Sequence, residues 1–175
     1  RLYGLSRLDT KATVTLVEGE SDCHTLWNHS INAVGVPGAS NWREDRDAPH
    51  LADCERIYVV IEPDQGGKAV LDWIEASSIR DRVWLVGLGE HKDTNNLHVD
   101  DPDRFKERWT QALELAKKWS ERQEVQRTRE AREALARCAD LAKAPNTSLT
   151  DLQLTYVRSA SSEKRVTPNS YSSRW

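Results

Sequence analysis

The sequence predicts an α/β domain in which about four mostly parallel central strands are flanked by helices, followed by a C-terminal helical extension. Short apolar runs alternate with amphipathic stretches, as strands and crossover helices alternate around a parallel sheet. Each run is nearly continuous in apolar character, which indicates a strand buried on both faces. From residue 102 the composition shifts to Glu, Arg, Lys, Ala and Leu, which favour helices. The four predicted strands are residues 14–17, 33–36, 57–61 and 83–86.

The segments between these strands supply the helices. Residues 21–30 and 67–77 each carry an apolar face and are expected to be right-handed crossover helices. Residues 37–55 contain several glycine, proline and asparagine residues, which predict a long loop with one short helix. Residues 103–118 repeat apolar side chains at helical spacing, so we expect an amphipathic helix packed on the sheet.

The chain has 175 residues, enough for one domain of ordinary size and an appendage. It contains no methionine, so we expect a piece of a larger polypeptide. The tail is rich in Ser and Thr and buries too little apolar area to offset its ordering entropy. We divide the chain into a linker from a missing upstream domain (1–12), the α/β domain (13–118), a charged helical extension (119–144) and a disordered tail (145–175).

Composition excludes several classes of protein. No apolar run approaches the ~20 residues that a bilayer crossing requires, so neither a transmembrane segment nor a membrane partner is expected. The three cysteines form no C-x-x-C pair, which argues against a zinc ribbon and a disulfide framework and favours a reduced, cytoplasmic setting. With 25 basic and 28 acidic side chains, the net charge of −3 provides no broad basic surface. A nucleic-acid substrate would therefore need a metal ion or a local patch to hold it.

An acidic turn follows the first predicted strand. Glu18 ends the strand, Gly19 permits a sharp turn, and a helix begins at once. Ligands of open parallel sheets bind at this end of the strands, so Glu18 is a candidate functional residue. Glu20 and Asp22 have a simpler explanation, because carboxylates stabilise the first turn of a helix.

A second acidic turn follows the third strand. Glu62 and Asp64 are separated by a proline that keeps the segment extended, so both carboxylates reach the same edge of the sheet. Clustered carboxylates repel one another unless a cation joins them, and Mg²⁺ or Mn²⁺ suits oxygen ligands of this kind. Gly66 and Gly67 let the backbone approach an anionic ligand where the next helix starts. A capped helix after an ordinary turn would explain the same residues.

The loop after the fourth strand is the third candidate segment. Parallel strands would bring it to the same sheet edge, where Lys92 offers a phosphate contact and Asp93 a further metal ligand. Surface loops commonly have this composition, so the segment does not define a site by itself.

In combination, these turns resemble the TOPRIM domain, which is shared by bacterial-type primases, topoisomerases, certain nucleases and recombination proteins. The motif sequences are most similar to those of primase-like proteins of phages and mobile elements. The resemblance covers roughly residues 2–116 and implies a TOPRIM-like, Rossmann-like fold. The matching motifs are VEGESD (17–22), VPGASNW (36–42), EPDQGG (62–67) and KD (92–93).

The resemblance also implies roles for the matching residues. Glu18 corresponds to the glutamate that is proposed in the family as general acid or base in nucleotidyl transfer. At Glu62 the family usually has aspartate, so this side chain is longer by one methylene. The expected partners are a single-stranded DNA template, nucleotides and a replicative helicase or ATPase domain. The implied ligands of Mg²⁺ (or Mn²⁺) are Glu62, Asp64 and Asp93, and the implied nucleotide contacts are Lys92, Gly66 and Gly67.

Several functions remain open from the sequence. The first is the catalytic core of a DNA primase-like nucleotidyltransferase that uses two-metal phosphoryl transfer. The second is a metal-dependent TOPRIM nuclease. The third is a non-catalytic module that binds metal or a partner, with the charged stretch 121–141 as its contact surface. A receiver-like domain fits less well, because its pattern places paired acids after the first strand and a lone aspartate after the third.

Overall fold

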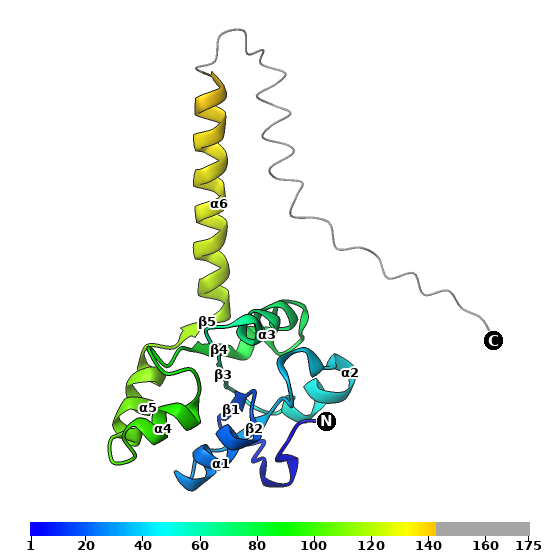
Figure 1. Ribbon diagram of the computed structural model, residues 1–175. Coiled ribbons are helices and arrows are strands. Elements are labelled where there is room, and N and C mark those ends of the chain that lie inside the picture. Colours follow the sequence, from blue (N-terminus) through cyan, green and yellow to red (C-terminus); the bar gives the residue numbers. More distant parts are fainter. Residues whose placement is uncertain (143–175) are drawn as a thin grey trace, which may run out of the picture. The chain divides into compact units, whose positions relative to one another are not determined.

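A computed structural model describes residues 1–142, in which an α/β sheet domain precedes a long C-terminal helix (Figure 1). The predicted tail at residues 145–175 lies outside the described residues. The chain divides into two compact units, Arg1–Arg122 and Gln123–Trp175. The sheet and every candidate site residue belong to the first unit.

The sheet has five strands in the order β2-β1-β3-β4-β5. The first four are parallel to their neighbours, whereas β5 is antiparallel to β4. This arrangement confirms the predicted α/β fold with a mostly parallel sheet, and it adds one short strand. The strands are β1 (Val14–Val17), β2 (Ala33–Gly35), β3 (Ile57–Val60), β4 (Val83–Val86) and β5 (Lys117–Lys118).

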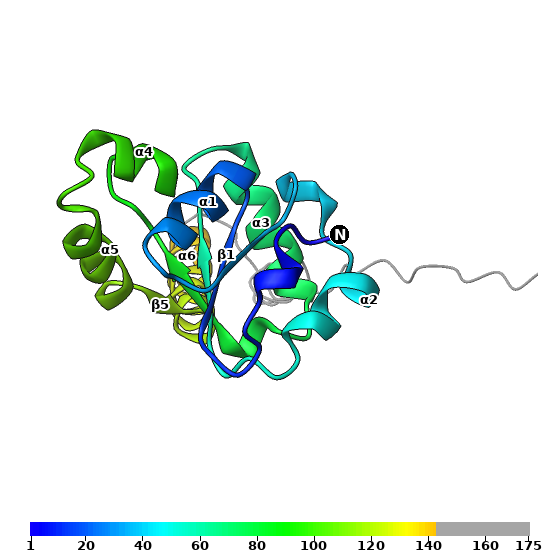
Figure 2. The same ribbon diagram turned by 90° about the horizontal axis from the view of Figure 1, so that it is seen from below.

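Helices cover both faces of this sheet (Figure 2). On one face lie α1 (Glu20–Asn28), α4 (Thr94–Asp100) and α5 (Phe105–Glu114). On the other lie α3 (Gln65–Ala76) and α2 (Glu44–Asp47). The short 3₁₀ helices are η1 (Leu5–Arg7), η2 (Ala39–Asn41), η3 (Ala48–Leu51) and η4 (Arg80–Arg82).

The strand side chains alternate between two cores. Ile57 and Val59 of β3 belong to the cluster on the α3 face, whereas Val60 belongs to the cluster with α1, α4 and α5. All three are at most 5% exposed. Burial on both faces explains why the strands are continuous apolar runs.

Residues 1–12, predicted to be a linker from a missing upstream domain, contact the sheet domain. Leu2 is 4% exposed and belongs to the hydrophobic core. The backbone of Tyr3 pairs with Gly35 at the edge of β2, with N···O distances of 2.8 and 3.0 Å. The sheet domain therefore includes this segment, because an apolar side chain and an unpaired strand edge are both available to bind it.

Two further segments differ from the expected secondary structure. The helix predicted over 103–118 ends at Glu114, and Lys117–Lys118 then pair with the free edge of β4. The loop expected after the fourth strand, residues 89–98, ends in a helix instead, because Thr94–Asp100 form α4. The ladder hydrogen bonds to β4 and the cap from Asp93 outweigh the weak local preferences of these polar segments.

The final described helix is α6 (Trp119–Ala142). Its first residue, Trp119, is 2% exposed and belongs to the core of the sheet domain. Beyond Arg122 the helix is strongly charged, and Arg129 pairs with Glu133 one turn away. Within residues 1–142, no helix is long and apolar enough to cross a membrane.

Candidate active site

The strand order creates a switch point between β1 and β3. The chain passes from β1 to β2 on one side and later returns to β3 on the other side of β1. In open α/β sheets, ligands bind in the crevice outside the carboxyl ends of the strands at such a point. Glu18 directly follows β1, and Glu62 and Asp64 follow β3, so the candidate residues flank this crevice.

Glu18 is held by only one of its carboxylate oxygens. Oε1 accepts a hydrogen bond from the backbone N–H of Ala39 at 3.2 Å. Oε2 is buried and has no hydrogen-bond partner among residues 1–142. A Cβ atom added to Gly66 would lie 2.6 Å from this oxygen. Glu18 thus directs an unpaired acceptor at the turn that follows β3.

Lys92 joins the two acidic residues of that turn. Its Nζ lies 3.1 Å from Oε2 of Glu62 and 3.4 Å from Oδ2 of Asp64. The side chains of Glu62, Asp64 and Lys92 are 10%, 43% and 58% exposed. The structure therefore brings together Glu18, Glu62, Asp64 and Lys92, and the cation between the two predicted metal ligands is an ammonium group.

The electrostatics of this cluster differ from residue to residue. Burial raises the pKa of Glu62, repulsion from Glu18 and Asp64 adds to the increase, and Lys92 opposes it. The pKa of Asp64 is lowered, mainly by hydrogen bonds from the backbone of Gly67 and also by Lys92. The pKa of Lys92 is raised by its two carboxylate partners, first by Glu62. Of the two acids that contact Lys92, Glu62 has its pKa raised and Asp64 has its pKa lowered.

The two glycines shape the turn. Oδ1 of Asp64 accepts hydrogen bonds from the N–H groups of Gly66 at 2.8 Å and Gly67 at 3.3 Å, so Asp64 caps α3. A Cβ atom on Gly67 would overlap the carbonyl oxygen of Glu62. Gly67 is therefore required for the close approach of helix and strand end, and both N–H groups already contact Asp64.

Asp93, the third predicted metal ligand, has another partner. Its Oδ1 accepts a hydrogen bond from the backbone N–H of Asn96 at 2.7 Å and caps α4. No hydrogen bond or ion pair joins it to Glu62 or Asp64 in the part of the chain that the structure describes. Its role as a ligand remains a prediction.

Asp22 joins α1 to α4, and this structural role was missed from the sequence. It is 3% exposed, and its Oδ1 accepts hydrogen bonds from Oγ1 of Thr94 at 2.7 Å and from the N–H of Asn95 at 3.0 Å. These contacts attach α1 to the first turn of α4, directly after the loop that carries Lys92. The partners are more than seventy residues apart, and no local pattern indicates such a pairing.

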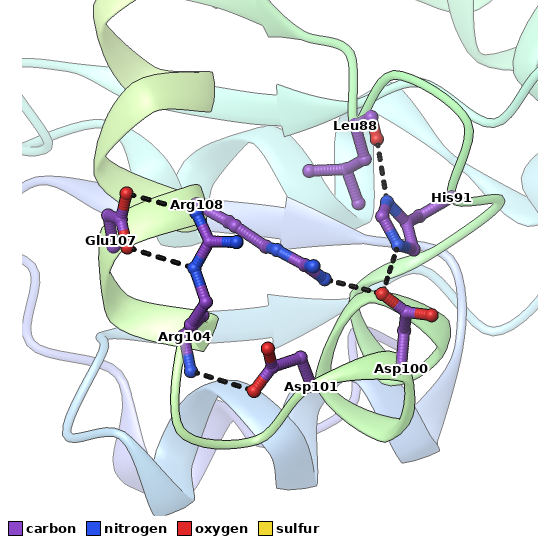
Figure 3. Close-up of polar contacts among 7 residues, drawn as sticks. All are labelled: Leu88, His91, Asp100, Asp101, Arg104, Glu107 and Arg108. Atoms are coloured by element: carbon purple, nitrogen blue, oxygen red, sulfur yellow. Dashed lines mark hydrogen bonds and ion pairs between the residues drawn. The ribbon is translucent and has the colours of Figure 1, made fainter.

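A second network holds the other side of this loop (Figure 3). Nδ1 of His91 lies 3.3 Å from the carbonyl oxygen of Leu88, and its Nε2 lies 3.3 Å from Oδ2 of Asp100. Nη1 of Arg108 in α5 donates to the same Asp100 oxygen at 2.6 Å. The His91 side chain thus joins the loop next to Lys92 to Asp100 of α4, which Arg108 of α5 also contacts.

The donor set suits a cation, but no metal site is assembled in this conformation. Among residues 1–142, no group of three or more His, Cys, Asp or Glu side chains is placed to hold a metal ion. The unpaired Oε2 of Glu18 and the two carboxylates around Lys92 are nevertheless hard oxygen ligands of the kind that Mg²⁺ and Mn²⁺ take. In their chemistry these oxygens suit a divalent cation, and the Lys92 ammonium lies between two of them.

Comparison with known proteins relates the chain to primases through its fold. No family model matches the chain, and no curated protein does. The primase fragment of the bacteriophage T7 primase-helicase protein is 24% identical, with a TM-score of 0.52 over 61% of this chain and 47% of that one. The E. coli primase catalytic core is 19% identical, with a TM-score of 0.57 over 91% and 56%. A DnaG primase catalytic domain bound to single-stranded DNA is 18% identical, with a TM-score of 0.53 over 91% and 55%.

These likenesses establish the fold. The chain has the α/β fold of DNA primase catalytic domains and spans about half the length of these solved structures. The order of its first four strands is also that of flavodoxin-like sheets, but the two-residue antiparallel β5 departs from the all-parallel pattern.

Proposed function

We propose that this chain is the TOPRIM catalytic core of a DNA primase-like nucleotidyltransferase, which acts on nucleic acid with Mg²⁺ or Mn²⁺. The observation that carries the proposal is the convergence of Glu18, Glu62 and Asp64 at the switch point of a primase-like sheet. A single-stranded DNA template and nucleotides are the proposed substrates, because one structural neighbour is a primase domain bound to single-stranded DNA. A replicative helicase or ATPase domain is the proposed partner.

Each side chain has a task in this proposal. Glu62 and Asp64 would hold the metal, with Asp93 from the neighbouring loop as a further ligand. The bound metal would neutralise phosphate charge and polarise the reacting phosphoryl group. Glu18 has a carboxylate oxygen at the crevice that is unpaired within residues 1–142, and it would accept the proton of the attacking 3′-hydroxyl. Lys92 would contact a substrate phosphate when it is not held by the carboxylates.

The test measures metal binding and turnover on matched variants. Mg²⁺ and Mn²⁺ are titrated calorimetrically into the wild-type chain and a Glu62→Gln, Asp64→Asn double variant. The control is an Asp72→Asn, Glu75→Gln double variant, which removes the same charge from the exposed side of α3. We expect the site variant to lose binding and the control to keep it. Equal binding by both double variants would contradict the proposed site.

Turnover then separates the three functions. The wild-type chain is incubated with a single-stranded DNA template, nucleoside triphosphates and Mn²⁺. Template-dependent product that disappears in Glu18→Gln supports the nucleotidyltransferase. Degradation of the template would instead identify a metal-dependent nuclease, and metal binding without either reaction would identify a non-catalytic module.

A further inference from the structure

The strongest unassigned feature of the site is the position of the Lys92 ammonium. It contacts Oε2 of Glu62 and Oδ2 of Asp64 together, at 3.1 and 3.4 Å. Both oxygens belong to predicted metal ligands, and the other oxygen of Asp64 is used to cap α3. The ammonium therefore engages the Asp64 oxygen that the cap leaves free for a metal ion.

The Lys92 ammonium and a metal ion cannot occupy the space between Glu62 and Asp64 at the same time. Mg²⁺ binds oxygen ligands at about 2.0–2.1 Å and requires them on its own coordination sphere. An ammonium group that remained between the same two oxygens would overlap that sphere and repel the ion. One cation must leave before the other enters.

The backbone around Lys92 is anchored, whereas its side chain is free to move. Asp93 caps α4 on one side, and His91 is bonded to Leu88 and Asp100 on the other. The Lys92 side chain itself is 58% exposed. Release of the ammonium to solvent therefore requires rotation of one flexible side chain and no movement of the loop.

The contact is specific to this lysine. Lys68, which lies on α3 close to the same turn, is exposed and makes no ion pair in the part of the chain described here. The two carboxylates of the turn thus pair with Lys92, from the loop after β4, and not with Lys68, which directly follows the turn in the sequence. Lys68 is the control, since it carries the same charge and lies on α3 next to the same turn without pairing with its carboxylates among residues 1–142.

We infer that Lys92 is an internal counter-ion of the metal site, which holds Glu62 and Asp64 in place when no metal is bound and which a divalent cation must displace. This inference rests on the proposed function, because it assumes that these carboxylates bind the metal. It adds a competition that lowers metal affinity in the free protein. Once displaced, the ammonium has the reach for the phosphate contact proposed above.

The experiment measures Mn²⁺ affinity of the full chain by calorimetry and by the loss of free-ion electron paramagnetic resonance signal. The variants are Lys92→Met, Lys92→Arg and the control Lys68→Met. Loss of the competing charge should tighten Mn²⁺ binding about tenfold in Lys92→Met, against about twofold or less in Lys68→Met. Lys92→Arg keeps the charge and should bind Mn²⁺ no more tightly than the wild type. It also serves as the test if Lys92→Met does not fold.

The outcomes separate this inference from the proposed function. Mn²⁺ binding that is lost in the Glu62→Gln, Asp64→Asn variant, yet equal in the two lysine-to-methionine variants, would overturn the counter-ion and leave the metal site standing. Tighter binding by Lys92→Arg than by the wild type would overturn it as well. No Mn²⁺ binding by any variant would overturn both. Tighter binding by Lys92→Met alone supports both.

Discussion

Two carboxylates from one short turn, Glu18 and Asp22, have opposite environments. Asp22 is 3% exposed, and one of its oxygens accepts two hydrogen bonds from the start of α4. Glu18 receives one hydrogen bond and keeps its second oxygen buried without a partner among residues 1–142. The paired acid joins two helices, and the unpaired acid faces the crevice. Hydrogen bonds from a distant helix, rather than acidity in the sequence, distinguish the structural residue from the candidate functional one.

The same contrast extends to the partners of each acid. Thr94 and Asn95 offer neutral donors, so the Asp22 contacts bring no second charge into the interior. Near Glu18 the neighbours are Glu62 and Asp64, which add negative charge; Lys92 pairs with both of them, and backbone N–H groups also stabilise Asp64. An arrangement that repels itself is costly for stability and is typical of functional sites.

The largest effect is expected from a substitution that removes the Asp22 carboxylate and its hydrogen bonds to α4. Asp22→Ala removes the acceptor of the Asn95 N–H and the nearer acceptor of Thr94 Oγ1, which keeps only the longer contact to the Asp22 carbonyl oxygen at 3.4 Å. We expect the free energy of unfolding to fall by about 2–4 kcal/mol, measured by urea denaturation. Glu20→Ala, an exposed acid in the same first turn, is the control and should change it by about 0.5 kcal/mol or less. Similar losses of unfolding free energy in both variants would show that the Asp22 hydrogen bonds have no special structural role.

Substitution of a glycine in the turn after β3 should have the next largest effect. Gly67→Ala places a methyl group against the carbonyl oxygen of Glu62 and should lower the free energy of unfolding by about 2 kcal/mol. In Gly66→Ala the added atom meets the movable carboxylate of Glu18 instead, so the stability loss should be smaller while metal binding weakens. Thermal unfolding with and without Mn²⁺ checks both expectations. A greater loss of stability in Gly66→Ala would contradict the assignment.

The contributions of Glu44 and Glu62 to stability should change with pH in opposite directions, because the pKa of Glu44 is lowered and that of Glu62 is raised. Glu44 is partly buried, which raises its pKa, but hydrogen bonds from Ser77, Ser78 and Trp42 outweigh this and lower it overall. Its stabilisation is therefore present above the ordinary glutamate range and is lost as the pH falls. The pKa of Glu62 is raised, first by burial, so its contribution is fully present below the ordinary range and is lost as the pH rises.

Substitution of each glutamate by uncharged glutamine tests this difference in pH dependence. Glu44→Gln should lose about 1 kcal/mol of stability at neutral pH, and the loss should shrink toward acid. Glu62→Gln should become more stable relative to wild type as the pH rises above the ordinary glutamate range, by less than about 1 kcal/mol. Urea denaturation at a series of pH values measures both. Parallel profiles would show that the two acids do not differ in this way.

The smallest effect on stability is expected for Glu18→Gln, which tests the contrast between Glu18 and Asp22. Glu18→Gln keeps an oxygen that accepts from Ala39 and removes a negative charge beside Glu62. The free energy of unfolding should therefore stay the same or rise, within about 0.5 kcal/mol. A loss comparable to that of Asp22→Ala would assign Glu18 to structure instead. The measurement is made on both variants under identical conditions.

The features predicted well from the sequence are those with a local cause. The apolar run at 57–61 identified β3 because a strand buried on both faces needs continuous β-branched and apolar residues. The parallel fold then placed Glu18, Glu62 and Asp64 at one sheet edge, where the structure has them. Their binding of metal remains a prediction.

The features that were missed depend on a partner far along the chain. Thr94 begins α4 because its hydroxyl is buried on Asp22 and Asp93 caps the helix. Lys117–Lys118 form β5 because the edge of β4 is unpaired at that point. Neither segment has an apolar periodicity of its own, so local sequence could not indicate its structure.

The sequence by itself determined the α/β class, the positions of the four parallel strands and the acidic turns at their carboxyl ends, because these follow from burial and turn chemistry within a few residues. Only the tertiary structure decided which acids are paired. Asp22 finds its donors in α4, and Lys92 lies between Glu62 and Asp64, through contacts that join separate turns of the chain. The energy of such contacts depends on distance and burial in space, and neither quantity is encoded in the spacing of residues along the chain.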